Sequence, residues 1–152
     1  MTGESSAWDA YVGAVIRIEA PGGVLWVRPA PAPTTHGQYP DAGKRTIYVV
    51  TAHNPGGQVV SATANAEAEA RFTAELGRRG LTWWPADGGD PSWSHVEPGA
   101  AVIGVTEADA LALAADFGQE AIFVLTPVER RVVGCADQRV SATGWVSEPE
   151  AA

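Results

Sequence analysis

The sequence predicts a single α+β domain with a ferredoxin-like core, in which strands and helices follow one another in the order β-α-β-β-α-β. In the middle of the chain, two segments with apolar residues at helical spacing alternate with short apolar runs, and this alternation carries the prediction. Residues 47–50 and 101–105 are apolar throughout, as is typical of central strands buried on both faces. We expect one β-hairpin before this core and another after it.

The N-terminal part is expected to supply a short helix and the first hairpin. Apolar residues in 7–15 recur at helical spacing. The runs 15–18 and 24–27 are separated by Pro21-Gly22-Gly23, whose glycines tolerate the positive φ of a tight turn. Residues 29–44 are rich in proline and small polar residues, so they are predicted to form a mobile surface loop.

Capping signals define the two helices of the core. Ser61 and Gly80 are the expected N-cap and C′ residues of the first helix, and Thr106 is the expected N-cap of the second, which runs toward Gly118. The expected strands are 45–51, 81–84, 100–105 and 121–125 in the core, and 128–134 and 140–146 in the C-terminal hairpin.

Length and composition indicate one domain, 7–146, with flexible ends at 1–6 and 147–152. A chain of 152 residues is long enough to bury a self-sufficient core. Its single cysteine and the lack of a signal-peptide pattern predict a cytoplasmic location. No apolar run approaches the roughly 20 residues that a membrane helix needs, so we expect no membrane partner.

The net charge of −8 opposes binding to the phosphate backbone of nucleic acids. The chain nevertheless contains two pairs of adjacent arginines. Arg78-Arg79 lies near a helix end, where cations complement the helix dipole, and Arg130-Arg131 is interpreted as the solvated edge of a strand. We therefore expect no nucleic-acid partner, and a small-molecule ligand or another protein instead.

A polar, turn-forming cluster, 51–57, directly follows the apolar run 47–50. Loops after buried strands often contact ligands. Asn54 precedes a proline and is biased toward extended backbone, so it either forms an Asx-type turn or offers a donor and an acceptor to a bound amide, base or carboxylate. Thr51 begins the same cluster and is a second candidate ligand contact.

Four further polar residues are candidates for the same site. Ser61 is a cap or a ligand contact, and Asn65 in the following helix is explained by a bond to the Asn54 loop or by a ligand at the helix N-terminus. Gln119 precedes a buried strand, so it must be hydrogen-bonded, either to backbone groups or to a ligand. His53 can shuttle protons near neutral pH, although a packed or surface histidine is the simpler interpretation.

Four short motifs occur in a fixed order along the chain: Thr51-Ala52-His53-Asn54-Pro55, Asn65 in the next helix, Trp93 with Glu97, and Phe117-Gly118-Gln119-Glu120-Ala121. Together they resemble a small uncharacterised bacterial family of domains of unknown function, whose pattern is T-A-x-N-P, a helical Asn, a W-x-E-type segment and F-G-Q-x-A. The resemblance covers 47–123. Glu97 departs from the pattern, because it lies four residues after Trp93. The family has no established activity, so the resemblance implies positions of interest and no mechanism.

Three functions are compatible with these residues. The first is binding of a small polar or nucleotide-like ligand near Thr51, Asn54, Ser61, Asn65 and Gln119. The second is a small acid-base enzyme with Glu97 or His53 as general base, and the third is a protein-protein interaction module. No metal or other cofactor is predicted, because the histidines and the one cysteine lack a recognised ligand spacing.

The topology decides whether the candidate residues meet. If the two central strands ran parallel, Asn54 and Glu97 would lie beyond opposite ends of the sheet, roughly 20 Å apart. A different topology would bring them together in one site. His95 and Glu97 alternate on an extended segment, so their side chains would share a face and form an acid-base pair or a salt bridge.

Overall fold

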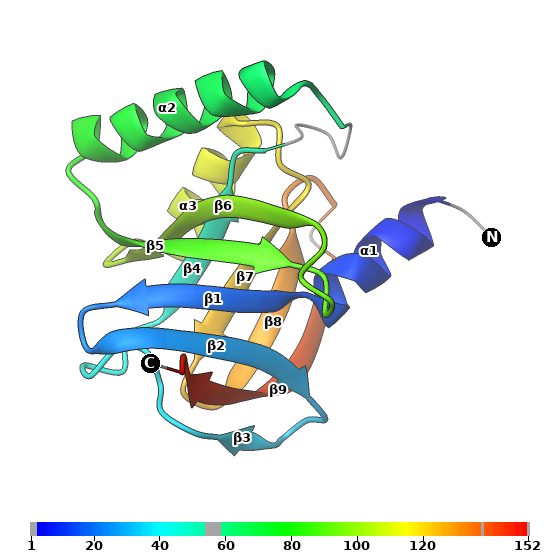
Figure 1. The fold of residues 1–152 in the computed structure, drawn as a ribbon, viewed down its shortest axis with the longest axis vertical. Coiled ribbons are helices and arrows are strands. Elements are labelled where there is room, and N and C mark those ends of the chain that lie inside the picture. The colour runs from blue at the N-terminus through cyan, green and yellow to red at the C-terminus, as the bar shows by residue number, and fades with distance from the viewer. Residues whose placement is uncertain (1–2, 54–58, 138, 152) are drawn as a thin grey trace.

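The computed structural model describes residues 3–53, 59–137 and 139–151, and these form three helices and nine strands (Figure 1). The helices are α1 (Gly3–Gly13), α2 (Ala62–Arg78) and α3 (Glu107–Asp116). The strands are β1 (Val15–Ala20), β2 (Gly23–Ala30), β3 (Thr35–His36), β4 (Ile47–Thr51), β5 (Thr82–Gly89), β6 (Val96–Ile103), β7 (Ala121–Thr126), β8 (Glu129–Gly134) and β9 (Val140–Pro149).

The strands close into an antiparallel β-barrel, so the predicted ferredoxin-like core is wrong. Their order is β2-β1-β5-β6-β4-β7-β8-β9-β3, and an additional pairing of β2 with β9 closes eight of them into the barrel. The central strands β4 and β6 are antiparallel neighbours, with Val50 opposite Ala100. The expectation of parallel central strands is therefore also wrong.

The two hairpins expected outside the core are part of the barrel wall. Strand β5 continues to Gly89, beyond the expected strand 81–84, and its extra length gives β1 an edge to pair with. Strand β9 likewise continues through Ser147 and Glu148, which were expected in the flexible end, and pairs there with β2. Closure satisfies the backbone groups that two open sheet edges would leave unpaired.

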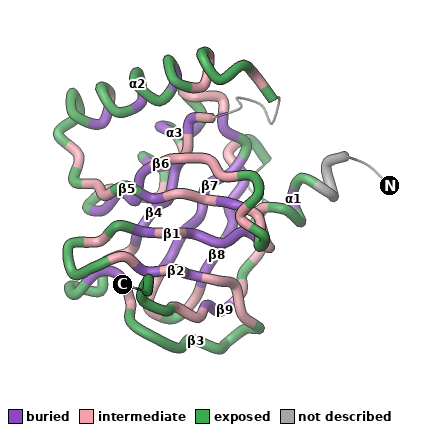
Figure 2. Tube along the Cα trace, in the orientation of Figure 1, coloured by how far each residue is buried: buried purple, intermediate pink, exposed green. Residues whose placement is uncertain are grey.

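Buried residues lie along the strands of the barrel (Figure 2), and alternation along the strands divides them between two cores. Inward-facing residues fill the barrel, including Ile16, Ile18, Val49, Phe123 and Leu125. The outward faces of β4, β6 and β7 form a second core with α2 and α3, which lie on one side of the barrel in Figure 1. Burial on both faces explains why 47–50 and 101–103 are apolar throughout, whereas Gly104 and Val105 lie beyond the end of β6.

The predicted helix caps are confirmed. The Ser61 hydroxyl accepts a hydrogen bond from the backbone amide of Ala64 at 3.1 Å, and the Thr106 hydroxyl accepts one from that of Asp109 at 3.1 Å. Gly80 follows α2 with a φ of 66°, as its C′ role requires. Local signals therefore predicted α2 and α3 correctly, but they did not predict the arrangement of the strands. Helix α1, expected within 7–15, instead spans Gly3–Gly13 and begins in the end that was expected to be flexible.

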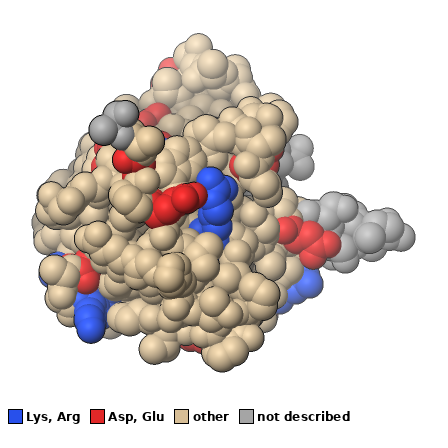
Figure 3. All heavy atoms as spheres, turned by 60° about the horizontal axis from the view of Figure 1, so that its bottom comes forward, with Lys and Arg blue, Asp and Glu red and all other residues tan. Residues whose placement is uncertain are grey.

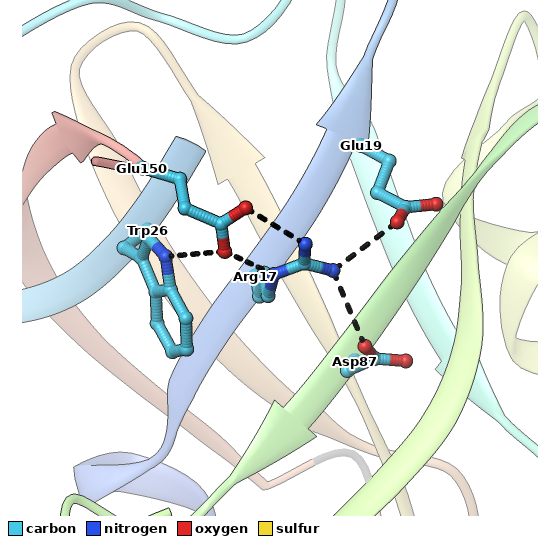
Figure 4. A network of polar contacts seen from close by, with 5 residues as sticks. All are labelled: Arg17, Glu19, Trp26, Asp87 and Glu150. Atoms are coloured by element: carbon cyan, nitrogen blue, oxygen red, sulfur yellow. Dashed lines mark hydrogen bonds and ion pairs between the residues drawn. The ribbon is translucent and has the colours of Figure 1, made fainter. Parts of the chain in front are cut away.

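A surface network ties the C-terminal segment to the barrel wall (Figure 4). The Arg17 guanidinium on β1 binds both oxygens of Glu150, at 2.7 and 3.0 Å, and also contacts Glu19 and Asp87. The Trp26 indole donates to the same Glu150 carboxylate at 3.2 Å. On the face seen in Figure 3 basic side chains similarly lie beside acidic ones.

The segment 29–44, expected to be mobile, is held against the barrel. Strand β3 pairs with β9, and the Tyr39 hydroxyl lies 2.7 Å from the carbonyl oxygen of Leu125. Asp41, which is 5% exposed, binds the Arg45 guanidinium at 2.7 Å and accepts from the Arg45 backbone amide at 2.9 Å. These bonds add to the packing of the Tyr39 ring against the barrel core and Trp145.

We expect Asp41→Asn to lower the free energy of unfolding at neutral pH and to reduce the further loss of stability as the pH falls. Hydrogen bonding to Arg45 holds the pKa of Asp41 at about 2, below its usual value near 3.8. Stabilisation by this carboxylate is therefore complete above about pH 4 and is lost as the pH falls toward 2. Urea unfolding at a series of pH values checks this, with the two proteins converging near pH 2. A constant difference from pH 7 to pH 2 would contradict it.

Candidate functional site

Three of the predicted site residues meet at one end of the barrel. Because β4 and β6 are antiparallel, the last residue of β4, Thr51, lies opposite Gly99 near the start of β6. The Thr51 hydroxyl donates to Gln119 Oε1 at 2.9 Å and lies 3.3 Å from Glu97 Oε1. Parallel central strands would have placed the residues after β4 at the opposite end of the sheet from Glu97. In the structure the side chains of Thr51 and Glu97 lie next to each other instead.

Gln119 links the segment before β7 to the end of β4. Its side chain is buried, with 8% of the residue exposed. The amide nitrogen donates to the carbonyl oxygens of His53 at 3.0 Å and Phe117 at 3.3 Å, while its oxygen accepts from Thr51. Partners at both ends of the amide offset its desolvation and fix its orientation.

A cavity of about 880 Å³ opens beside this hydrogen-bonded group, at the end of the barrel where α1 packs. Its floor includes Val49 and Phe123 from the barrel interior, and Thr51 and Glu97 line its edge. Helix α1 supplies one wall, and the loop between β5 and β6, residues 90–95, supplies part of the rim. The cavity therefore joins the barrel core to solvent.

The lining of this cavity is acidic. Four carboxylates contribute to it, from Asp9, Asp90, Glu97 and Glu120, and no Lys or Arg is among its described lining residues. Tyr11 also faces it, and burial, followed by the charges of Glu120 and Glu97, raises the pKa of its hydroxyl to about 12. The Tyr11 phenol is thus a neutral hydrogen-bonding group at physiological pH.

A buried arginine holds the α1 wall in place. Arg130 is 1% exposed, and its guanidinium donates to the carbonyl oxygens of Val12 at 2.8 Å, Ala14 at 2.9 Å and Tyr11 at 3.1 Å. It also lies over the ring of Phe123, 5.2 Å from its centre. Burial lowers the pKa of Arg130 to about 10, so it stays charged at neutral pH, where the carbonyl groups at the end of α1 offset its charge.

The expectation that Arg130 lies on a solvated strand edge is wrong. Within β8, Arg130 and Val132 occupy the same face, and both are buried in the barrel. In a strand, side chains two positions apart lie on the same face, so Arg130 is expected on the face of the apolar Val132. This spacing was the one sequence signal that the Arg130 side chain points into the barrel.

Of the predicted site residues that the structure describes, Gln119, His53, Ser61 and Asn65 lie outside the cavity lining. The His53 ring points to α2, where its Nε2 lies 3.2 Å from Glu69 Oε2. Ser61 serves as the cap of α2, and Asn65 lies in the first turn of that helix, its backbone amide donating to the Ser61 carbonyl at 3.0 Å. Asn54 lies outside the described residues, so the structure does not address its predicted role.

His95, rather than His53, shares the cavity with Glu97. The predicted alternation of His95 and Glu97 agrees with this placement. Within the described parts of the chain, no group of three or more His, Cys, Asp or Glu side chains is arranged to hold a metal ion. None of the described helices is long and apolar enough to cross a membrane.

The fold and the site define a small antiparallel barrel with a helix-walled cavity at one end. Residues 50–122 match the model of the family described as "Protein of unknown function (DUF3293)". This match confirms the predicted resemblance to an uncharacterised family, and it includes Thr51, Glu97 and Gln119 while leaving out α1 and Arg130. Comparison with curated proteins and with solved structures gives no match for the chain.

Proposed function

We propose that the barrel-end cavity binds a small polar molecule that carries a positive charge or several hydrogen-bond donors. The single observation that carries this proposal is that Thr51 and Glu97 line the cavity side by side, with Thr51 held by a hydrogen bond to the buried Gln119. Side chains fixed by one another lose little freedom when a ligand binds, which favours a preorganised site. The volume of about 880 Å³ is within the range of small-molecule sites.

The charge of the lining narrows the class of ligand. Carboxylates attract protonated amines and accept hydrogen bonds from neutral donors, while they repel phosphates. The aromatic ring of Tyr11 also lines the cavity and offers a contact for a cation or a planar group. Within the predicted class of polar or nucleotide-like ligands, we therefore favour amines and nucleosides without phosphate.

A thermal-shift screen tests this proposal. The probes are agmatine, putrescine, tyramine and adenosine, and AMP and acetate serve as anionic comparisons. We expect at least one amine or adenosine to raise the melting temperature in a concentration-dependent way, because ligands that bind the folded state stabilise it by mass action. No shift with any uncharged or cationic probe, or shifts with the anions alone, would contradict the proposal.

Glu97→Gln is expected to weaken binding of a cationic probe by about tenfold, which corresponds to about 1.4 kcal/mol. The change keeps the shape of the side chain and removes its charge. The matched control is Glu67→Gln on the exposed face of α2, away from the cavity. Isothermal titration calorimetry of both variants measures the effect, and equal affinities in the two would contradict the role of Glu97.

An acid-base enzyme is the second candidate, because His95, Glu97 and Tyr11 face the same cavity. His95 takes the place that the sequence assigned to His53, whose ring is paired with Glu69. Any probe that binds is incubated with the protein and followed by NMR for product formation. Turnover that is lost in His95→Gln but kept in His53→Gln supports this candidate, and binding without turnover excludes it for those probes.

A further inference from the structure

Trp93 belongs to a motif of the family resemblance, yet it does not line the cavity. Its backbone has a φ of 59°, in the left-handed region that bulky residues seldom adopt. Such a conformation persists only where the surrounding structure enforces it, and it is frequent at functional sites. The contacts of the indole show what enforces it here.

The Trp93 ring lies on the outside of the barrel wall. It packs edge-to-face against Trp26 of β2, with 4.6 Å between the ring centres. It also covers Gly89, the last residue of β5, so closely that a Cβ atom at Gly89 would lie 2.8 Å from two carbons of the ring. Glycine at this position is therefore required for the ring to dock.

The backbone around Trp93 forms a closed loop over the rim of the barrel. The Trp93 amide donates to the Asp90 carbonyl at 2.8 Å, and the Asp90 amide donates to the His95 carbonyl at 3.2 Å. The Asp90 carboxylate accepts from the His95 amide at 2.7 Å and is also bonded to the Ser92 hydroxyl. Asp90, Ser94 and His95 line the cavity on the inner side of this loop.

We infer that Trp93 is a positioning residue, whose indole anchors the loop to the outer wall so that Asp90, Ser94 and His95 face the ligand cavity. The ring and the lining residues are on opposite sides of the loop, so the anchor acts on the cavity without touching its contents. Its effect on ligand binding rests on the proposed function, whereas its effect on the loop does not.

Two variants remove the anchor in different ways. Trp93→Ala deletes the ring, and Gly89→Ala keeps the ring but displaces it by steric conflict. Trp83→Phe is the matched control, because Trp83 packs in the second core beside α2 and does not line the cavity. We expect either anchor variant to lower the hydrogen-exchange protection of the His95 amide by about tenfold, with amides of β4 unchanged, as for a local opening.

The double variant provides the most specific measurement. A Cβ atom at Gly89 would also lie 3.0 Å from the His95 carbonyl oxygen, so Gly89→Ala has a direct effect on His95 besides its effect on the ring. If Gly89→Ala also acts by displacing the ring, its effect on His95 protection is smaller when Trp93→Ala is already present, and the two changes are non-additive. The affinity for the amine probe identified by the thermal-shift screen is compared in Trp93→Ala, because Gly89 itself lines the cavity. It should fall by about tenfold there, and Trp93→Phe should restore part of it.

These measurements test two properties of Trp93 separately: its anchoring of the loop and the effect of that anchor on ligand binding. Unchanged His95 protection in both single variants, or additive effects in the double variant, would overturn the anchoring role. Lost protection with unchanged probe affinity would overturn the link between the anchor and the ligand. If the wild-type protein binds none of the probes, the proposed function fails, and the exchange measurements alone still decide whether Trp93 anchors the loop.

Discussion

Arg130→Ala is expected to lower the free energy of unfolding by about 3 kcal/mol or more, one of the two largest effects that the structure predicts. The substitution leaves the carbonyl oxygens of Tyr11, Val12 and Ala14 without their guanidinium donors and opens a void beside Phe123. Relief of the buried charge offsets part of this loss, but it does not refill the void. Denaturant unfolding monitored by circular dichroism measures the change.

Arg130→Met is the comparison that separates hydrogen bonding from packing. Methionine fills much of the space of the arginine stem and supplies no donor, so we expect a smaller loss of about 1–2 kcal/mol. Hydrogen exchange should locate the loss in the last turn of α1 in both variants. If Arg130→Met is as stable as the wild-type protein, the three hydrogen bonds to α1 contribute nothing net, and the anchoring role of Arg130 is contradicted.

Gly99→Ala is expected to destabilise the protein by about 1–3 kcal/mol or more, because β4 and β6 are in close contact at this residue. A Cβ atom at Gly99 would lie 2.3 Å from the carbonyl oxygen of Val50 and 2.8 Å from the Thr51 methyl group. Relief of this overlap requires the two strands to separate beside Thr51. Urea unfolding gives the loss of stability, and binding of the amine probe should weaken with it.

Gly77→Ala provides the control for a change from glycine to alanine. Gly77 lies within α2, and nothing is within 4 Å of the position that its Cβ would take. Alanine there should raise stability by about 0.5–1 kcal/mol, because it favours the helix over the unfolded chain. Equal effects of Gly77→Ala and Gly99→Ala would show that β4 and β6 are not in contact at Gly99.

The helices could be predicted from the sequence because their signals are local. Ser61, Gly80 and Thr106 act on the backbone within a few residues, and the structure places them where those signals indicate. Strand pairing depends instead on residues far apart in the chain. The pairing of β2 with β9 joins Val27 to Ser147, and no local pattern in either segment specifies that partner.

The need of Thr51 and Gln119 for polar partners could be predicted for the same reason, although their contact with each other could not. Thr51 and Gln119 are polar residues at the ends of buried segments, and such residues need partners, which they find in each other. The wall of the cavity could not be predicted in this way. Tyr11 lies in the segment 7–15, for which the sequence predicted only a short helix, and its place in the cavity with Glu97 depends on barrel closure and on the anchor provided by Arg130.

The central claim is that antiparallel pairing of β4 and β6 brings Thr51 and Glu97 to one cavity, and a NOESY spectrum of the labelled protein tests it most directly. The structure predicts backbone contacts in antiparallel register, joining Tyr48 to Val102 and Val50 to Ala100, together with a contact between the Thr51 and Glu97 side chains. Contacts in a parallel register, or an absence of any contact between Thr51 and Glu97 in a fully assigned spectrum, would contradict it.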